Sequence, residues 1–197
     1  MEKIIEKKIG KSKKYFYNGE QYASKEEIYF SWFLDDLKEL SHIKYTWYQP
    51  ETFTLIPAPK YCWTQKNVKS TTEKKGNIMD SLKYTPDFQI VWSRKGIEDY
   101  VYILNKENIS MRSRNRKPFV AIRDKDDTGG DLISYVDVKG SFGQHGDAVK
   151  FPVLQKTIFL TKGIYVEKIV PKKLFTKTFY PERYLLTDGL TKKRKIS

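Results

Sequence analysis

The stretch Tyr135-Val136-Asp137-Val138-Lys139-Gly140 carries the pattern that decides the fold of this chain. Apolar and polar residues alternate along it, which predicts a β-strand over residues 133–139. Side chains two residues apart on a strand lie on the same face. We therefore expect Asp137 and Lys139 on one face and the two valines on the other, so that a rigid element holds an acid and an amine together.

A second segment, Tyr84-Thr85-Pro86-Asp87-Phe88, opens another apolar stretch and predicts a strand over residues 87–92. Its Asp87 would supply a second carboxylate if the two strands lie side by side. Magnesium binds hard oxygen ligands and keeps several waters, so one or two carboxylates and a substrate phosphate can hold it. A metal-activated water beside a lysine can then hydrolyse a phosphodiester. The alternatives are an exposed ion pair on an edge strand for Asp137 and Lys139, and a simple turn for Pro86-Asp87.

Composition limits the classes of function. The 197 residues are most simply one domain, residues 1–197, and 37 Lys plus Arg against 24 Asp plus Glu give a net charge of +13. Such an excess favours an anionic partner, and nucleic acid is the commonest one, although some basic proteins are merely soluble. One cysteine, Cys62, and two histidines exclude a disulfide framework and a cysteine- or histidine-rich metal site.

No segment has the apolar run of a signal peptide or of a membrane span. We therefore expect no membrane partner and a cytoplasmic location, which is the host cytoplasm if a phage encodes the protein.

The N-terminal half contains clear local signals. Residues 1–12 are predicted to be a loose charged leader, and Asn18-Gly19 predicts a tight hairpin. Ser24 and Glu27 have the spacing of a capping box, which predicts a helix from Ser24 to about residue 40. Residues 43–47 and 52–56 are predicted to pair as strands joined around Gln49-Pro50.

The remaining segments are predicted as follows. Residues 57–82 should form a long surface loop, and residues 93–132 an insertion or extended hairpin with short strands at 100–104 and 119–123. A helix over 151–160 would have Pro152 in its first turn, followed by a strand over 164–170 and a basic tail over 191–197. The insertion holds a basic cluster suited to a phosphate backbone, or else a solvated loop: Arg112, Arg114, Arg116 and Lys117.

Taken together, these segments resemble the PD-(D/E)xK nuclease superfamily, with Pro86-Asp87 matching the first motif half and Asp137-Val138-Lys139 the second. The similarity is greatest to a branch of small phage-type endonucleases that are Holliday-junction-resolvase-like or transposon-endonuclease-like. Further matching segments cover most of residues 15–160: Tyr17-Asn18-Gly19, Ser24-Lys25-Glu26-Glu27, Gln49-Pro50 and Phe151-x-x-x-Gln155-Lys156. Asp137 follows Asp87 by 50 positions, a longer separation than this family usually has there.

The resemblance implies an α/β fold with a central mixed β-sheet flanked by helices, a restriction-endonuclease-like core, with an N-terminal hairpin and a basic insertion. It implies a Mg²⁺-dependent DNA endonuclease in which Mn²⁺ can substitute. The implied metal ligands are Asp87, Asp137, the carbonyl of Val138 and a glutamate of the first helix, with Lys139 positioning the attacking water. Capping-box spacing favours Glu27 as that glutamate, whereas Glu26 lies nearer the middle of the apolar stripe.

Gln155 or Lys156, on the helix after the lysine strand, could assist the site or simply lie on a helix surface. The resemblance also suggests a branched or recombination intermediate of phage DNA as substrate, and cutting both of its strands would call for a homodimer. Two other interpretations stay open. The chain could be a DNA-binding module of the same fold that no longer cuts, or an RNA-processing nuclease with the same site.

Overall fold

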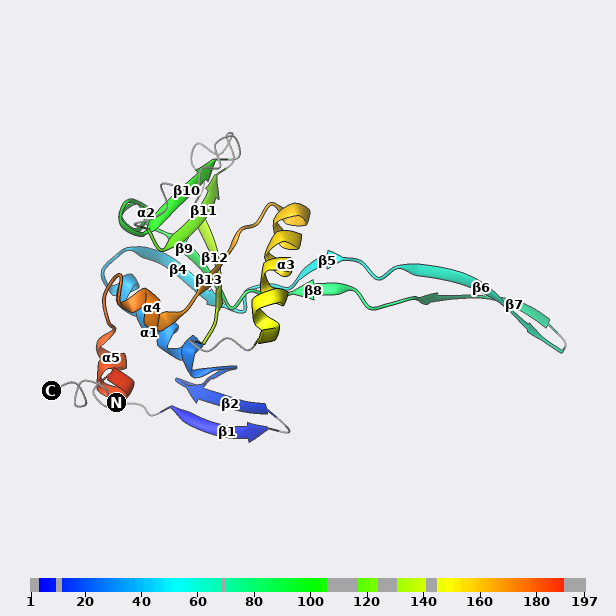
Figure 1. Ribbon diagram of the computed structural model, residues 1–197, viewed down its shortest axis with the longest axis horizontal. Coiled ribbons are helices and arrows are strands. Elements are labelled where there is room, and N and C mark those ends of the chain that lie inside the picture. Colours follow the sequence, from blue (N-terminus) through cyan, green and yellow to red (C-terminus); the bar gives the residue numbers. More distant parts are fainter. Residues whose placement is uncertain are drawn as a thin grey trace.

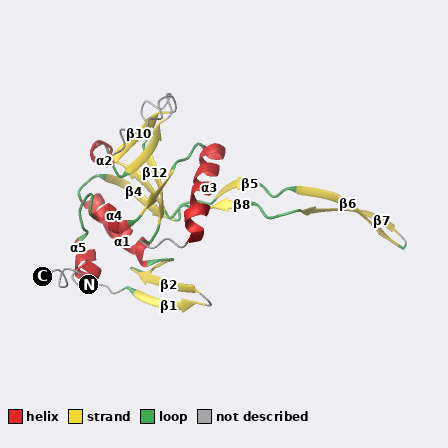
Figure 2. Cartoon of the chain, in the orientation of Figure 1, coloured by secondary structure: helices red, strands yellow, loops and turns green. Residues whose placement is uncertain are grey.

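The computed structural model describes residues 4–9, 12–68, 70–105, 117–123, 131–140 and 145–189. These residues form an α/β body from which one long two-stranded ribbon projects (Figure 1). Helices lie around a mixed sheet, as the secondary-structure colours of Figure 2 show. The predicted α/β class with a mixed sheet is therefore confirmed.

The central sheet has four strands in the order β13 (Val166–Ile169), β12 (Ile133–Val138), β9 (Phe88–Trp92) and β4 (Ile43–Tyr48). β12 runs parallel to β13 and antiparallel to β9, and β9 runs antiparallel to β4. The two strands predicted to carry the site are therefore neighbours in the middle of the sheet.

The predicted first helix is confirmed as α1 (Lys25–Glu39). The Glu27 N–H donates to Ser24 Oγ over 3.2 Å, which is the predicted N-cap bond. The Glu27 carboxylate accepts from the Ser24 hydroxyl over 2.9 Å and from the Ala23 N–H over 3.0 Å. The apolar stripe of α1 packs against the sheet, and Phe30, Phe33 and Leu37 are fully buried. Val136 and Val138 of β12 belong to this same core.

Helix α3 (His145–Lys162) packs against β13 and β5 (Phe53–Ile56), over a smaller cluster that includes Tyr84, Phe151 and Ile158. It begins six residues earlier than predicted. Pro152 consequently lies inside the helix and not in its first turn. The predicted strand over 164–170 is confirmed as the shorter β13.

The C-terminal segment was not anticipated. α4 (Pro171–Phe175), α5 (Glu182–Tyr184) and the π-helical turn Leu185–Gly189 follow β13, and α4 and α5 pack on α1. Phe33 stacks on Phe179 with ring centroids 4.8 Å apart and also contacts Phe175. This aromatic contact ties the C-terminal segment to the first helix. The predicted basic tail, 191–197, lies outside the described residues.

The insertion contains α2 (Arg94–Tyr100), β10 (Val101–Asn105) and β11 (Phe119–Arg123). Both predicted short strands therefore exist. They pair in parallel, so the extended hairpin is wrong, because parallel strands need a crossover connection. Ser134 Oγ donates to the Val120 carbonyl over 2.8 Å, which fixes β11 beside β12.

At the N-terminus, β1 (Ile5–Ile9), β2 (Ser12–Tyr17) and β3 (Glu20–Tyr22) form an antiparallel sheet. The hairpin at Asn18-Gly19 is confirmed, with φ angles of 53° and 77°. The loose leader is wrong for residues 5–9. A run of charges predicts exposure, but it does not reveal that β2 offers a strand edge for pairing.

The predicted pairing of residues 43–47 with 52–56 is also wrong. β4 pairs with β9, whereas β5 pairs with β8 (Leu82–Tyr84). Gln49 explains the difference, because its φ of 46° turns the chain and its N–H donates to the Asp87 carbonyl over 2.8 Å. The chain therefore leaves β4 next to β9 and cannot fold back on itself.

The described residues of 57–82 lie on the surface, but most of them form strands and not a loop. Within them β6 (Lys60–Asn67) and β7 (Ser70–Asn77) pair antiparallel and form the ribbon that projects from the body (Figure 1). The sequence did not reveal these strands because both of their faces are exposed and mostly polar, so no sustained apolar alternation marks them. Among the described helices, none is long and apolar enough to cross a membrane.

Phe33 is the buried centre of the contact between α1 and the C-terminal segment. We expect Phe33→Ala to lower the free energy of unfolding by about 3–5 kcal/mol, because it leaves a cavity among aromatic rings. Leu160→Ala on α3 is the control, since Leu160 is 82% exposed, and it should change the stability by less than about 0.5 kcal/mol. Urea denaturation measures both variants, and equal stabilities would contradict this account of the core.

Candidate active site

Asp87 and Asp137 lie opposite each other at the ends of two adjacent strands. Phe88 pairs with Val136, so the register continued by one residue brings the two aspartates together. The Val138 N–H donates to Asp87 Oδ2 over 2.7 Å, which fixes the Asp87 carboxylate across the strand boundary. The predicted convergence of the two acids is therefore present.

Lys139 completes this arrangement. Its Nζ lies 2.9 Å from Asp137 Oδ2, as expected for side chains two residues apart. Asp137 is only 4% exposed and β12 is an internal strand, so the pair is not an exposed ion pair on an edge. The Lys139 N–H donates to the Ile169 carbonyl over 2.8 Å, which holds the chain beside β13 just past the end of β12.

The carboxylates of Asp87, Asp137 and Glu27 lie close enough to affect one another's ionisation. Burial, together with the negative charges of Asp137 and Glu27, raises the pKa of Asp87 to about 7. The Val138 N–H and the Lys139 ammonium act in the opposite direction but do not offset these effects. The site therefore concentrates more negative charge than its own lysine balances, which is the condition under which a cation binds favourably.

Glu27 faces this site from the first turn of α1 and is held by several donors. Tyr48 Oη donates to Glu27 Oε2 over 2.7 Å, and the Ala23 N–H donates to the same oxygen over 3.0 Å. Burial raises the pKa of Tyr48, and so does this hydrogen bond to a carboxylate. The carboxylate of Glu27 is thus fixed both as a helix cap and as a charge near Asp87.

Glu26 also approaches the end of β12. A Cβ atom added to Gly140 would lie 3.6 Å from Glu26 Oε1, so this carboxylate reaches the residue after Lys139. Glu26 is half-buried, whereas Glu27 is 5% exposed. The geometry brings both glutamates to the site and leaves two candidates for the helix carboxylate.

Two tyrosines at the site had no predicted role: Tyr48, described above, and Tyr84. The Tyr84 side chain is buried, and burial raises its pKa, as do the charges of Asp137 and Asp87. Its phenol therefore stays protonated beside the acids. The sequence gives no signal for these contacts, because the position of each tyrosine depends on which strand pairs with the one that carries it.

The other predicted residues have different surroundings. Gln155 Nε2 donates to the Val166 carbonyl over 2.6 Å, which joins α3 to β13, and Lys156 is exposed. Lys117 Nζ donates to the Ile97 carbonyl of α2 over 3.2 Å. The remaining members of the predicted basic cluster, Arg112, Arg114 and Arg116, lie outside the described residues. The Val138 carbonyl stays a predicted ligand.

Within the described part of the chain, no three acidic, histidine or cysteine side chains stand together in a group that could hold a metal ion. The donor chemistry nevertheless fits a hard divalent cation. Two carboxylates from adjacent strands, with further places filled by water and a substrate phosphate, are what Mg²⁺ uses. The crowding that raises the pKa of Asp87 is the observation behind this fit.

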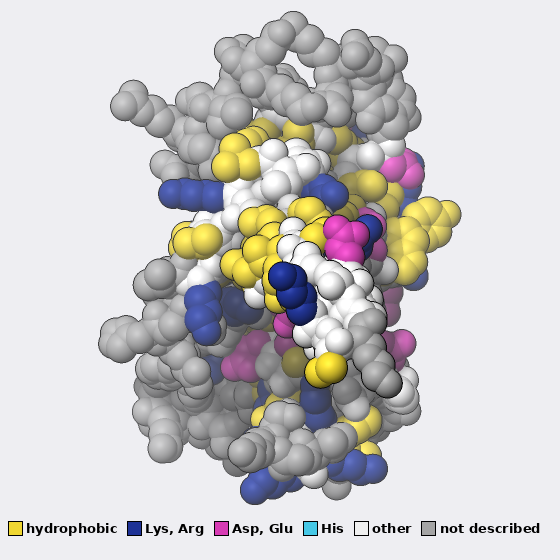
Figure 3. Space-filling model, turned by 90° about the vertical axis from the view of Figure 1, so that its right-hand side faces the viewer, with side chains coloured by type: hydrophobic (Ala, Val, Ile, Leu, Met, Phe, Trp, Pro, Cys, Tyr) yellow, Lys and Arg dark blue, Asp and Glu magenta, His cyan; other side chains and the backbone are white. Residues whose placement is uncertain are grey.

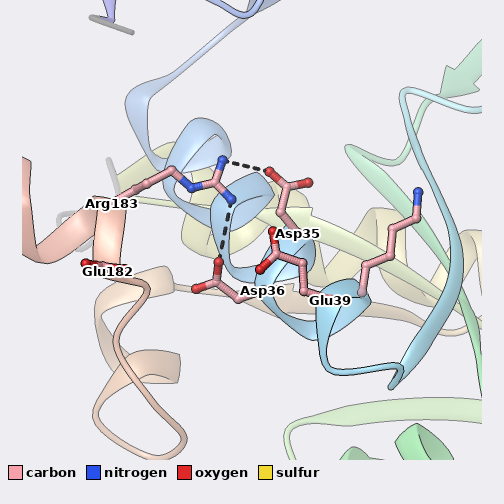
Figure 4. A pocket seen from close by; sticks show the side chains of 6 residues that line it. Asp35, Asp36, Glu39, Glu182 and Arg183 are labelled. Carbon is pink, nitrogen blue, oxygen red and sulfur yellow. Dashed lines mark ion pairs between the residues drawn. The ribbon is translucent and has the colours of Figure 1, made fainter. Parts of the chain in front are cut away.

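A separate depression of about 530 Å³ lies between the C-terminal half of α1 and α5 (Figure 4). Arg183 pairs there with Asp35 over 3.0 Å and with Asp36 over 3.5 Å. These ion pairs attach α5 to α1. The depression lies at the opposite end of α1 from Glu27, so it is not part of the acid site.

A scan against protein-family models gave no match to this chain, and searches of curated proteins and of solved structures found no significant match.

We expect Asp87→Asn to stabilise the metal-free protein by about 1–3 kcal/mol at about pH 8. The carboxylate is ionised there and is repelled by its neighbours in the folded state, and asparagine keeps an oxygen for the Val138 N–H. Thermal unfolding in EDTA measures the change. Asp80→Asn, which removes an exposed charge, is the control and should change little. A lower melting temperature for Asp87→Asn would show that the acids do not repel one another.

Proposed function

We propose that this protein is a Mg²⁺-dependent endonuclease that hydrolyses DNA phosphodiester bonds. One observation carries the proposal: Asp87, just before β9, and Asp137 of the adjacent internal strand β12 lie opposite each other, with Lys139 2.9 Å from Asp137. Buried acids and an amine in this arrangement have no evident structural purpose, because replacing such a group by apolar side chains is often neutral or stabilising.

The proposal includes the resemblance to the PD-(D/E)xK superfamily and a restriction-endonuclease-like core. The mixed sheet supports it, since both motif halves lie at the same end of neighbouring strands. α1 packs on the face to which Val136 and Val138 contribute, and α3 packs against β13. This is the arrangement that the resemblance implies.

Each residue has a role in the proposed reaction. Asp87 and Asp137, with the Val138 carbonyl, would hold the cation, which lowers the pKa of a bound water and offsets charge on the phosphate. Lys139 orients the attacking water and balances negative charge that develops on the phosphate oxygens. Its ion pair with Asp137 keeps the ammonium group at the site before substrate arrives.

DNA is the proposed substrate because the net charge of +13 favours a polyanion. A branched or recombination intermediate, cut by a homodimer, is the narrower form of this proposal. The buried acids argue against a silent DNA-binding module, since negative charges facing phosphate weaken binding. An RNA-processing nuclease would use the same site, and the choice of substrate in the assay separates the two.

We expect Asp137→Asn to reduce cleavage by about 100-fold or more, because it removes charge from the metal site. DNA affinity in EDTA should be unchanged or tighter, since one repulsive charge is lost. The assay uses branched, duplex and single-stranded DNA and RNA, with Mg²⁺ or EDTA, and gel analysis of the products. Cleavage at the native rate by this variant, or cleavage that persists in EDTA, would refute the proposed mechanism.

Two variants decide which helix glutamate serves the site. We expect Glu27→Gln to slow cleavage by about 10- to 100-fold, because Glu27 is the helix charge that acts on Asp87. Glu26→Gln should have a smaller effect. Ser24→Ala is the control, since it weakens the same helix cap by about 1 kcal/mol without changing a charge. A slower reaction with Glu26→Gln than with Glu27→Gln would assign the role to Glu26.

A further inference from the structure

The β6–β7 ribbon, residues 60–68 and 70–77, is the most exposed element of the described chain, and we call it the arm. Its strands pair in register from Lys60 with Asn77 to Asn67 with Ser70. Except for the half-buried Gly76, the residues of both strands are exposed. Eight residues of strand extend about 26 Å, and the arm projects well away from the body (Figure 1).

The arm carries a flat aromatic surface. Tyr61 and Trp63 lie on the same face of β6, with ring centroids 4.8 Å apart and an interplanar angle of 21°. They remain 43% and 39% exposed, so the stacked pair has large areas in contact with solvent. We call these two residues the aromatic platform.

Gly76 helps to form this platform. It pairs with Tyr61 across the ribbon, and a Cβ atom at residue 76 would lie 3.0 Å from Cζ3 of Trp63. The indole ring therefore lies over the glycine backbone, where any other residue would displace it. Trp63 thus packs against both Gly76 and Tyr61 and still remains partly exposed to solvent.

Positive charge surrounds the platform. The described arm has one glutamate, Glu73, and four exposed lysines, a net charge of +3: Lys60, Lys66, Lys74 and Lys75. Lys74 is the cross-strand neighbour of Trp63. None of the four makes an ion pair with another described residue. Figure 3 looks toward the side from which the arm projects, and basic and hydrophobic side chains occur together there.

We propose that the arm binds nucleic acid by stacking unpaired bases on Tyr61 and Trp63, with its lysines contacting the phosphates. Exposed aromatic rings among cations are the means by which proteins hold single strands without reading their sequence. The net positive charge favours this ligand over a basic protein partner or a second copy of this basic chain.

The arm is continuous with the acid site. β7 leads through β8 to Tyr84, which lies beside Asp137, and Asp87 follows three residues later. Lys74, opposite Trp63, precedes Tyr84 by ten residues, so the platform lies at most about 35 Å from the site along the chain. That is about ten base pairs of duplex. Only this last step rests on the proposed nuclease function: a strand held on the arm would enter the site from an unpaired region.

The test measures binding of fluorescein-labelled oligothymidylate of about 20 nucleotides to the full chain carrying Asp137→Asn, in EDTA. We expect Trp63→Ala to weaken binding by about 5- to 150-fold, the loss of one stacked base. Gly76→Val should also weaken it, because it keeps both aromatic residues but displaces the indole ring of Trp63. A duplex of the same length should respond less, because its bases are already stacked.

Trp47→Ala is the matched control, since Trp47 is an exposed tryptophan on β4 that contacts Tyr45. It should leave the affinity unchanged. An unchanged affinity for Trp63→Ala would overturn the proposal. Loss of a dimer in Trp63→Ala, measured by sedimentation with DNA affinity intact, would overturn it too and assign the arm to a protein interface. The melting temperature of each variant checks that the body is folded.

The experiments distinguish failure of the arm proposal from failure of the nuclease proposal. Binding is measured without metal and with a cleavage-deficient chain, so it does not depend on catalysis. If the arm variants bind weakly but the native chain never cuts DNA in Mg²⁺, the arm stands and the nuclease assignment fails. If the native chain cuts DNA and the arm variants bind it normally, the nuclease assignment stands and the arm proposal fails.

Discussion

The pairing of β9 with β12 is the constraint on which the rest of the structure depends. Their register places Asp87 opposite Asp137, and the Val138 N–H fixes the Asp87 carboxylate. A shift of one residue would turn every side chain of β12 to the other face and would separate Asp87 from Asp137 and Lys139. The apolar side chains of β12 prevent that shift, because Val136 and Val138 belong to the core beneath α1. Core packing and site geometry thus fix the same register.

That register has an energetic cost. Burial and neighbouring negative charges raise the pKa of Asp87 to about 7, so the folded state disfavours its ionised form. Large aromatic contacts elsewhere, such as those of Phe33 and Phe30 beneath the sheet, supply the stability that permits this arrangement. A carboxylate that is poorly accommodated by the protein alone is well suited to an interaction with a cation, as the proposed function requires.

Local chemistry made α1, the Asn18-Gly19 hairpin and the strands of the site predictable from sequence, because each has its own periodicity, cap or turn residues. The pairing partners were less predictable. The partners of β4 and β5 depend on Gln49, whose N–H bonds to the Asp87 carbonyl, and no pattern reveals a contact between segments so far apart. β6 and β7 were missed because strands exposed on both faces lack apolar alternation. The choice between Glu26 and Glu27 was open in the sequence, and the structure places both carboxylates near the acid site.

The joint at the base of the arm has a mechanical consequence. β5 and β8 pair over only a few residues, and their register shifts between Thr54 and Ile56. Helix α3 packs on β5 at this joint, whereas the exposed strands β6 and β7 beyond it form a single layer that resists bending poorly. A bulge is a place where a strand bends. We therefore expect the arm to move as one ribbon that bends at this bulge. Its tip would sweep a wide volume, while the strands beside Tyr84 turn through only a small angle.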